Sequence, residues 1–285
     1  MYSHIKNIVF YYVEEPCLHT SKLGYLQYVL RSAVKHSPKC KLWLIADVNP
    51  NIEGVEYVSR ESLKNDLAEQ YKDNFEYPYV FNPRVYVFES INRWFYINEL
   101  IKQKGLTSIA SFDTDVMVLG EVSETEQVHP VASHLAYDFF KTDRIVTDFI
   151  CPNVIFINDV NILDDYCRYC VEIFKNKESE YYVLCEEMEK YKEQNGITDM
   201  ATLGLYMIRN REKFGVGTGI INGQIYDVSI TGSDGLDMEG EFKKVFKVGE
   251  FFYGTSCGNN IKINSLHFNG HYKERIEGFY NKFIR

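Results

Sequence analysis

Two aspartates, one residue apart, stand between apolar runs. Residues 108–119 read SIASFDTDVMVL, with Asp113 and Asp115 inside the run. Alternate side chains of an extended strand share a face, so both carboxylates are expected on one side at a strand end. Such oxygens bind Mg²⁺ or Mn²⁺, and a cation beside a diphosphate would neutralise its leaving-group charge. The alternative, two solvated aspartates at a turn, is disfavoured by the buried character of the flanking runs.

A second polar motif lies near the C-terminus, where residues 266–273 read LHFNGHYK. His267 offers an imidazole, a good ligand for Mn²⁺. Gly270 allows the backbone to approach a bulky anion, and Lys273 offers a point charge for a phosphate. Alone, the motif is also consistent with a surface loop. Together with the aspartates, it predicts a metal-diphosphate site.

The elements that must position these motifs follow from hydrophobic periodicity. Strands alternating with helices are typical of a parallel sheet with crossover helices, and ligands of such sheets bind at the carboxyl ends of the strands. The strand that ends at Asp113 belongs to this series. The pattern predicts strands at 7–13, 41–46 and 56–59, a helix at 21–34 capped by Ser21, a polar helix at 60–73, a loop at 77–83 and a helix at 84–104.

The alternation weakens beyond Gly120, and the second half is expected to decorate the sheet within one continuous α/β domain. The pattern there predicts strands at 131–137 and 154–157, an amphipathic helix at 160–174, an acidic, solvated helix at 178–192, and short strands at 224–230, 242–248 and 261–266.

Composition and net charge limit the kinds of molecule that this protein is expected to bind. The chain has 285 residues, 45% hydrophobic and 25% charged, as expected for a globular protein with a sizeable core. Its 31 Lys and Arg against 40 Asp and Glu give a net charge of −9, which argues against nucleic acid as the main partner. An anionic substrate would therefore need a metal or a few placed cations.

Cysteine usage and hydropathy indicate the compartment. The seven cysteines are scattered, which favours a reducing environment. Cys167 and Cys170 form a CxxC, but they share a helical stripe with Leu163, Tyr166 and Phe174 and are interpreted as core thiols. The sequence shows no signal peptide and no apolar run near the roughly 20 residues of a membrane span. A cytoplasmic protein is expected, either free or peripheral at the membrane surface.

The order of elements and both motifs resemble the GT-A glycosyltransferases, most of all the glycogenin and galactosyltransferase-like group, family eight. The resemblance implies a Rossmann-like, mostly parallel sheet flanked by helices and one domain over 1–285. Residues 1–120 would form the nucleotide-sugar half and 121–285 the acceptor side. It implies that Asp113 contacts the donor ribose and the metal, that Asp115 and His267 are further metal ligands, and that Gly270 and Lys273 contact the diphosphate.

Three further residues match the family by position. Arg93 stands where the family has an arginine that contacts the nucleotide sugar; an ordinary helix-surface arginine is the alternative. Asn153 resembles the segment beside the donor sugar, and the alternative is a strand cap. Asp199 resembles the acidic segment at the reacting sugar, and the alternative is that Asp199 or Thr198 caps the next helix.

The implied activity is a Mn²⁺- or Mg²⁺-dependent hexosyl- or pentosyltransferase in polysaccharide biosynthesis. The donor would be a nucleotide sugar, with UDP favoured over GDP, and the acceptor a glycan, a protein or a lipid-linked chain. The resemblance implies a retaining reaction; an inverting one would need a base, for which Asp199 and Asp138 are candidates. The aromatic segments 75–81 and 251–253 would line an acceptor groove or, more simply, belong to the core.

Two other functions fit parts of the sequence. A haloacid-dehalogenase-like phosphatase would use Asp113 as nucleophile and Asp115 as general acid, with 233–237 as its late acidic motif. Its aspartates normally follow the first strand, however, and it leaves His267 unexplained. A non-catalytic nucleotide- or glycan-binding module of the same fold is the other alternative.

Overall fold

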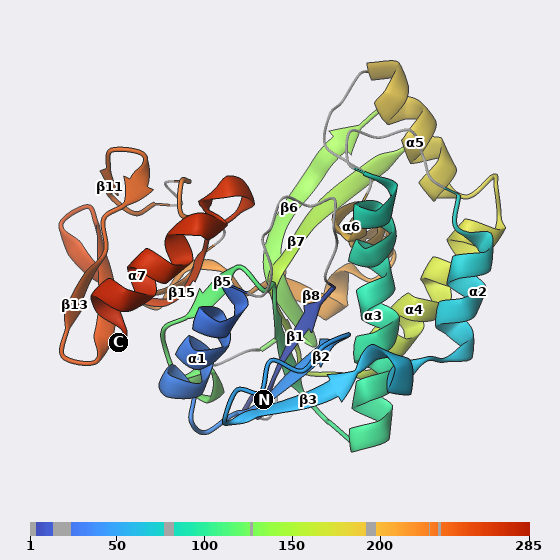
Figure 1. The fold of residues 1–285 in the computed structure, drawn as a ribbon. Coiled ribbons are helices and arrows are strands. Elements are labelled where there is room, and N and C mark those ends of the chain that lie inside the picture. Colours follow the sequence, from blue (N-terminus) through green and yellow to red (C-terminus); the bar gives the residue numbers. More distant parts are fainter. Residues whose placement is uncertain are drawn as a thin grey trace.

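The computed structural model describes residues 4–13, 24–76, 83–125, 128–191, 198–227, 229–232 and 235–285. Its centre is a seven-stranded sheet with the order β3-β2-β1-β4-β7-β6-β8 (Figure 1). Strand β7 is antiparallel to its neighbours β4 and β6, and the other neighbouring pairs are parallel. The predicted mostly parallel α/β sheet is thus confirmed. Its strands are β1 (Asn7–Tyr12), β2 (Lys41–Ala46), β3 (Val55–Ser59), β4 (Ile109–Phe112), β6 (Val131–Lys141), β7 (Val146–Ile157) and β8 (Phe214–Val216).

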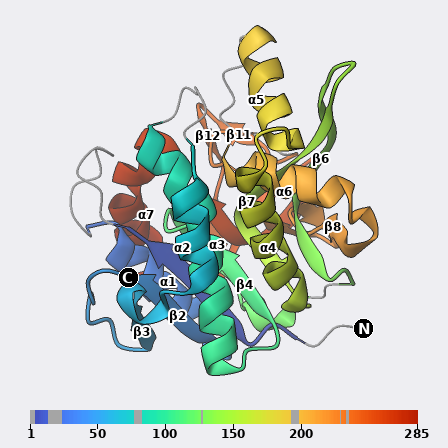
Figure 2. The same ribbon diagram turned by 90° about the vertical axis from the view of Figure 1, so that its right-hand side faces the viewer.

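Helices cover both faces of this sheet. One face carries α1, and the other carries α2, α3, α4 and α6, as Figures 1 and 2 show. Helix α7 packs against α1 beside the second sheet. Strand β2 shows why helices are needed on both faces, because it has apolar side chains on each. Leu42 and Leu44 are buried in the core on one face, and Trp43 and Ile45 in the core on the other. The helices are α1 (Leu26–His36), α2 (Asp66–Asn74), α3 (Arg84–Lys104), α4 (Asn161–Lys175), α5 (Glu180–Tyr191), α6 (Asp199–Ile208) and α7 (Ile276–Phe283).

A second sheet, built mainly from the C-terminal region, packs beside the first. Strand β15 is its centre: it pairs with β14 and β5 in antiparallel fashion and with β10 in parallel fashion. Because β5 comes directly after β4, this sheet begins where the central one presents Asp113. Its strands are β5 (Val116–Val118), β9 (Gly219–Ile221), β10 (Gln224–Tyr226), β13 (Phe246–Val248), β14 (Phe251–Ser256) and β15 (Asn259–His267), and β11 (Met238–Glu239) pairs separately with β12 (Phe242–Lys243).

The long helix α3 has the bounds that the sequence predicts. Pro83 precedes its first turn, and Gly105 ends it in the left-handed conformation at φ 61°. Helix α1 differs, because it begins at Leu26 and ends at His36; Ser21 lies outside the described residues. The predicted helix 60–73 is interrupted, because the Asn65 side chain accepts a hydrogen bond from the Ala68 amide and starts α2 anew.

Other differences arise where tertiary pairing extends or divides an element. Strands β6 and β7 pair with each other well beyond 131–137 and 154–157. The predicted strand 224–230 is only β10, and 242–248 is divided into β12 and β13. Helix α5 is not simply solvated, because it buries Tyr181, Leu184 and Met188. The loop predicted at 77–83 lies outside the described residues, apart from Pro83.

Two simpler expectations can be checked directly. Cys167 and Cys170 are fully buried on α4, which confirms them as core thiols. None of the described helices has the length and apolarity needed to cross a membrane. The division of the chain near residue 120 and the cytoplasmic location stay predictions.

Candidate metal centre

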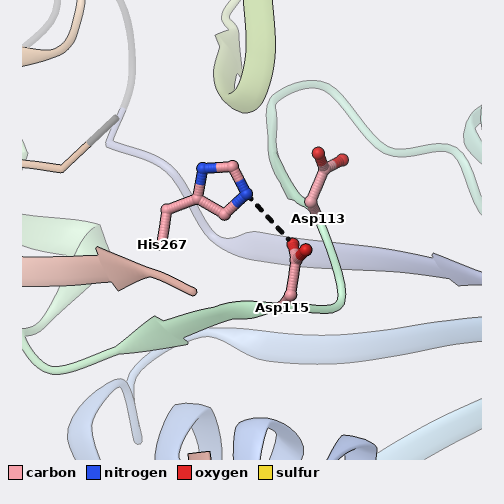
Figure 3. A group of neighbouring side chains, drawn as sticks. All are labelled: Asp113, Asp115 and His267. Carbon is pink, nitrogen blue, oxygen red and sulfur yellow. Dashed lines mark ion pairs between the residues drawn. The ribbon is translucent and has the colours of Figure 1, made fainter. Parts of the chain in front are cut away.

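Asp113 and Asp115 lie on the turn that connects the two sheets. Strand β4 ends at Phe112, and the amide of Val116 donates to the carbonyl of Asp113 at 3.0 Å. The two residues therefore belong to a tight turn, and not to an extended strand as predicted. Their carboxylates nevertheless reach one place, because the chain turns from β4 into β5 around it (Figure 3).

His267 is brought to the aspartates by strand register. It is the last residue of β15 and lies opposite Val116 of β5, one residue after Asp115. The amide of Phe268 donates to the carbonyl of Asp115 at 2.9 Å, which fixes the two chains at this point. As a result, Nε2 of His267 lies 3.3 Å from Oδ1 of Asp115 (Figure 3).

The three side chains suit a divalent cation. One ligand atom from each of Asp113, Asp115 and His267 lies within 4.8 Å of the others. Two carboxylates and one imidazole form a donor set that accommodates Mn²⁺, and Mg²⁺ less well. Three protein ligands also leave coordination positions for oxygen atoms of a phosphate.

Lys273 contacts the same carboxylate from the other side. Its Nζ lies 3.2 Å from Oδ2 of Asp115. Burial opposes ionisation of Asp115, but His267 and Lys273 hold the pKa of Asp115 well below its usual range. Gly270 begins the short 3₁₀ helix Gly270–Arg275 at φ 62°, with open space where a side chain would stand. The backbone there is accessible to a bulky group.

Arg93 joins the first aspartate to a buried carboxylate. One nitrogen of its guanidinium pairs with Asp113, and Nη2 lies 2.5 Å from Oδ2 of Asp199. Trp94 donates its indole N–H to the same oxygen of Asp199 at 3.0 Å. Burial raises the pKa of Asp199, an effect that contact with Arg93 opposes. With a side chain only 14% exposed, Arg93 is not an ordinary surface arginine.

The capping role near Asp199 belongs to its neighbour. The Thr198 side chain accepts a hydrogen bond from the Met200 amide at the start of α6. Asp199 is therefore free to point toward Arg93, while Thr198 caps the helix. The predicted capping alternative therefore applies to Thr198, and the role of Asp199 at the reacting sugar stays a prediction.

Asn153 lies inside β7 and is buried, so the strand-cap interpretation is wrong. Its Nδ2 lies 3.1 Å from Nδ1 of His267 and donates to the carbonyl of Asp227 at 3.2 Å. Because the same Nδ2 donates to the Asp227 carbonyl, the carboxamide presents an N–H group to Nδ1 of His267 as well. Asp138 lies on β6, and its side chain is outside the described part of the chain.

Sequence patterns did not reveal every residue around the centre. Trp94 was visible only as the neighbour of Arg93, and Asp227 carries no motif that points to His267, although its carboxylate accepts the His267 amide. The aromatic segments divide: Phe75 and Phe252 are buried in the core, whereas Phe251 is exposed. Residues 77–81 lie outside the described residues.

No protein-family model and no curated protein sequence matches this chain. Among solved structures, it is similar to mouse xyloside xylosyltransferase 1 in its apo form, with 10% identity over 78% of this chain and 88% of that one and a TM-score of 0.47. It is similar to the galactosyltransferase LgtC in complex with donor and acceptor sugar analogs, with 13% identity, 98% and 96% coverage and a TM-score of 0.47. The glycosyltransferase GlyE of Streptococcus pneumoniae TIGR4 matches at 13% identity over 78% of this chain and 47% of that one, with a TM-score of 0.41.

Proposed function

We propose that this protein is a metal-dependent glycosyltransferase of the GT-A type. It would move a sugar from a nucleoside-diphosphate sugar, most simply a UDP-sugar, to a hydroxyl group of a glycan, a protein or a lipid-linked acceptor. One observation carries the proposal: Asp113, Asp115 and His267 converge at the carboxyl end of β4, and Lys273 lies at the same carboxylate. This combination of oxygen ligands, imidazole and a nearby cation suits a metal-diphosphate site.

The residues of the chain have distinct roles in this proposal. Asp113, Asp115 and His267 would hold Mn²⁺ or Mg²⁺, which when bound stabilises charge on the departing diphosphate. Gly270 leaves space for the phosphate groups, and Lys273 would exchange Asp115 for a phosphate oxygen. Arg93 keeps Asp113 in place through a charged contact and adds positive potential next to the donor.

Asp199 is proposed to bind the donor sugar and not to act as a base. Its carboxylate is buried and already contacts Arg93 and Trp94, which stabilise it in one orientation. A carboxylate fixed by these two contacts is a precise hydrogen-bond partner for a sugar hydroxyl. Asn153 would orient the imidazole of His267 and would not contact the sugar itself. The proposed reaction is retaining, and the diphosphate itself takes the acceptor's proton.

The phosphatase alternative is less well supported by the same contacts. Its nucleophile would be Asp113, but a carboxylate paired with a guanidinium is a poor nucleophile. In its late acidic motif, Asp237 is exposed and accepts a hydrogen bond from Thr255, and residues 233–234 lie outside the described part. Among the described residues, Asp113 and Asp115 form a possible metal site together with His267, a residue that the phosphatase would not use.

Calorimetric titration of UDP and GDP, with and without Mn²⁺, tests the proposal. Tight binding of one nucleotide only with metal is expected, and Asp115→Asn should abolish it. Asp237→Asn is the matched control, because it removes the same charge from the position that only the phosphatase needs. Absence of nucleotide binding under every metal condition would refute the proposal.

Turnover distinguishes the enzyme from a binding module. The enzyme should release UDP from at least one nucleotide sugar of a panel when an acceptor is supplied. Metal-dependent binding of nucleotide without turnover of any donor would favour the non-catalytic module. Release of inorganic phosphate from phosphate monoesters would favour the phosphatase.

A further inference from the structure

A fully buried ion pair lies behind the metal centre. Lys243, at the end of β12, pairs its ammonium group with Oδ1 of Asp227, and both side chains are completely shielded from solvent. Asp227 comes directly after β10, so the pair joins two segments of the C-terminal region. A buried ion pair costs desolvation energy, and replacing it by apolar side chains is often neutral or favourable for stability. Stability alone is therefore a weak reason for this pair.

The carboxylate of Asp227 has a second partner that gives it a different role. Its Oδ2 accepts a hydrogen bond from the backbone amide of His267 at 3.1 Å. The backbone of Asp227 is held against the same strand, since its amide lies 3.3 Å from the hydroxyl oxygen of Ser265. The carbonyl of Asp227 accepts from Asn153, which also contacts the His267 ring. Asp227 thus contacts His267 directly and through Asn153.

Lys243 is also connected to the backbone carbonyl of His267, through Ile230. The Lys243 amide donates to the carbonyl of Ile230 at 3.0 Å, and the Ile230 amide donates to the carbonyl of His267 at 2.9 Å. His267 is consequently held at its amide, its carbonyl and its ring by one connected network. A strand end held only by backbone hydrogen bonds to neighbouring strands can fray. The end of β15 is held in addition by the contacts of His267 with Asp227, Asn153 and Ile230.

We infer that the Asp227–Lys243 pair is a positioning device for the metal ligand His267, a conclusion that rests on the proposed function. The carboxylate fixes the position of the His267 backbone at the end of β15, and the ammonium holds that carboxylate in one orientation inside the protein. Groups that orient a metal ligand from behind typically change metal affinity by about 10- to 100-fold when removed. Neither residue contacts the cation in this scheme, so both are positioning residues and not catalytic ones.

Two double variants separate this role from general stability. Asp227→Asn with Lys243→Met removes both charges but keeps an oxygen that can accept the His267 amide. Asp227→Leu with Lys243→Met removes the charges and the acceptor while keeping a similar volume. Glu187→Gln is the matched control, because Glu187 is a buried carboxylate paired with Arg144 on another part of the molecule. The readouts are Mn²⁺ affinity without nucleotide and the free energy of unfolding in urea.

The leucine variant should bind Mn²⁺ at least tenfold more weakly than the asparagine variant, and Glu187→Gln should bind it as the unaltered chain does. Equal affinities of the two double variants would overturn the inference and leave the proposed function intact. Failure of the unaltered chain to bind Mn²⁺ at all would overturn both.

Hydrogen exchange gives a second test that does not need the leucine variant to fold. Lys243→Met leaves Asp227 buried without its cation and lowers global stability, so both amides should exchange faster, and the His267 amide should accelerate by a larger factor than the Leu44 amide in β2. Equal acceleration at both amides would show a general loss of stability and overturn the inference.

Discussion

Removing the Lys273 ammonium should strengthen binding of the metal alone and weaken binding of the nucleotide. Nζ of Lys273 lies 3.2 Å from Oδ2 of Asp115, and His267 approaches Oδ1 of the same carboxylate at 3.3 Å. A cation that binds Asp115 must therefore compete with this ammonium. Once a diphosphate is bound, the ammonium gains a new partner, so the competition ends.

The size of the effect follows from the exposure of the pair. A hydrogen bond between charged groups contributes about 1.5–3 kcal/mol net. The Lys273 side chain is 29% exposed and Asp115 is 10% exposed, so water screens part of the interaction and the lower limit applies. About 1.5 kcal/mol corresponds to roughly tenfold tighter binding of Mn²⁺ to Lys273→Ala.

The assay is calorimetry in two arms. Mn²⁺ is titrated into the unaltered chain and into Lys273→Ala, and UDP is then titrated into each at saturating Mn²⁺. Lys282→Ala is the control, since it changes net charge equally from a position on α7. Tighter Mn²⁺ binding and weaker UDP binding are expected for Lys273→Ala, and neither change is expected for Lys282→Ala. Unchanged or weaker Mn²⁺ binding by Lys273→Ala would refute the competition argument.

Three further changes test separate parts of the molecule. Asp115→Asn should lower Mn²⁺-dependent UDP affinity about 100-fold by calorimetry, and retained binding would refute Asp115 as a ligand. Loss of the charged contacts with His267 and Lys273 should also lower the free energy of unfolding by about 1.5–3 kcal/mol. Arg93→Met should cost about 3 kcal/mol in urea unfolding, because Asp199 remains buried without its guanidinium. Part of this loss should return with Asp199→Asn, and an unchanged midpoint would contradict the reasoning. Despite the opposing effect of burial, contacts with Lys102 and others lower the pKa of Asp164 to about 2. Asp164→Asn should therefore cost about 1 kcal/mol at pH 7, and the difference should shrink as pH falls below about 4 toward 2; a difference that grows on acidification would contradict this.

Local patterns predicted the elements whose ends and faces are defined by neighbouring residues. Helix α3 begins after Pro83 and ends at Gly105, and both residues act through their own backbone geometry. Strand β2 was predicted because its side chains are apolar on both faces. The start of α1 and the division of 60–73 escaped prediction. In the second case, a single side-chain contact at Asn65 outweighed helical periodicity.

The sequence also identified Asp113, Asp115 and His267 as candidate ligands, because carboxylates and an imidazole stand out inside apolar or glycine-containing segments. It could not show that they meet. The pairing of β5 with β15 joins residues about 150 positions apart, and the ligand distances follow from that register. The geometry of the aspartates was predicted for a strand, whereas the structure places them on a turn.

Periodicity and short motifs by themselves determined the α/β class of this chain and the residue types of its candidate metal centre, since these depend on local preferences and on which side chains avoid water. The tertiary structure alone decided which charges became partners. Arg93 joins Asp113 to Asp199, and Lys243 joins Asp227 behind His267. A charged side chain gives no local sign of its partner, because the pair forms only when the fold has removed both groups from water and brought them into contact.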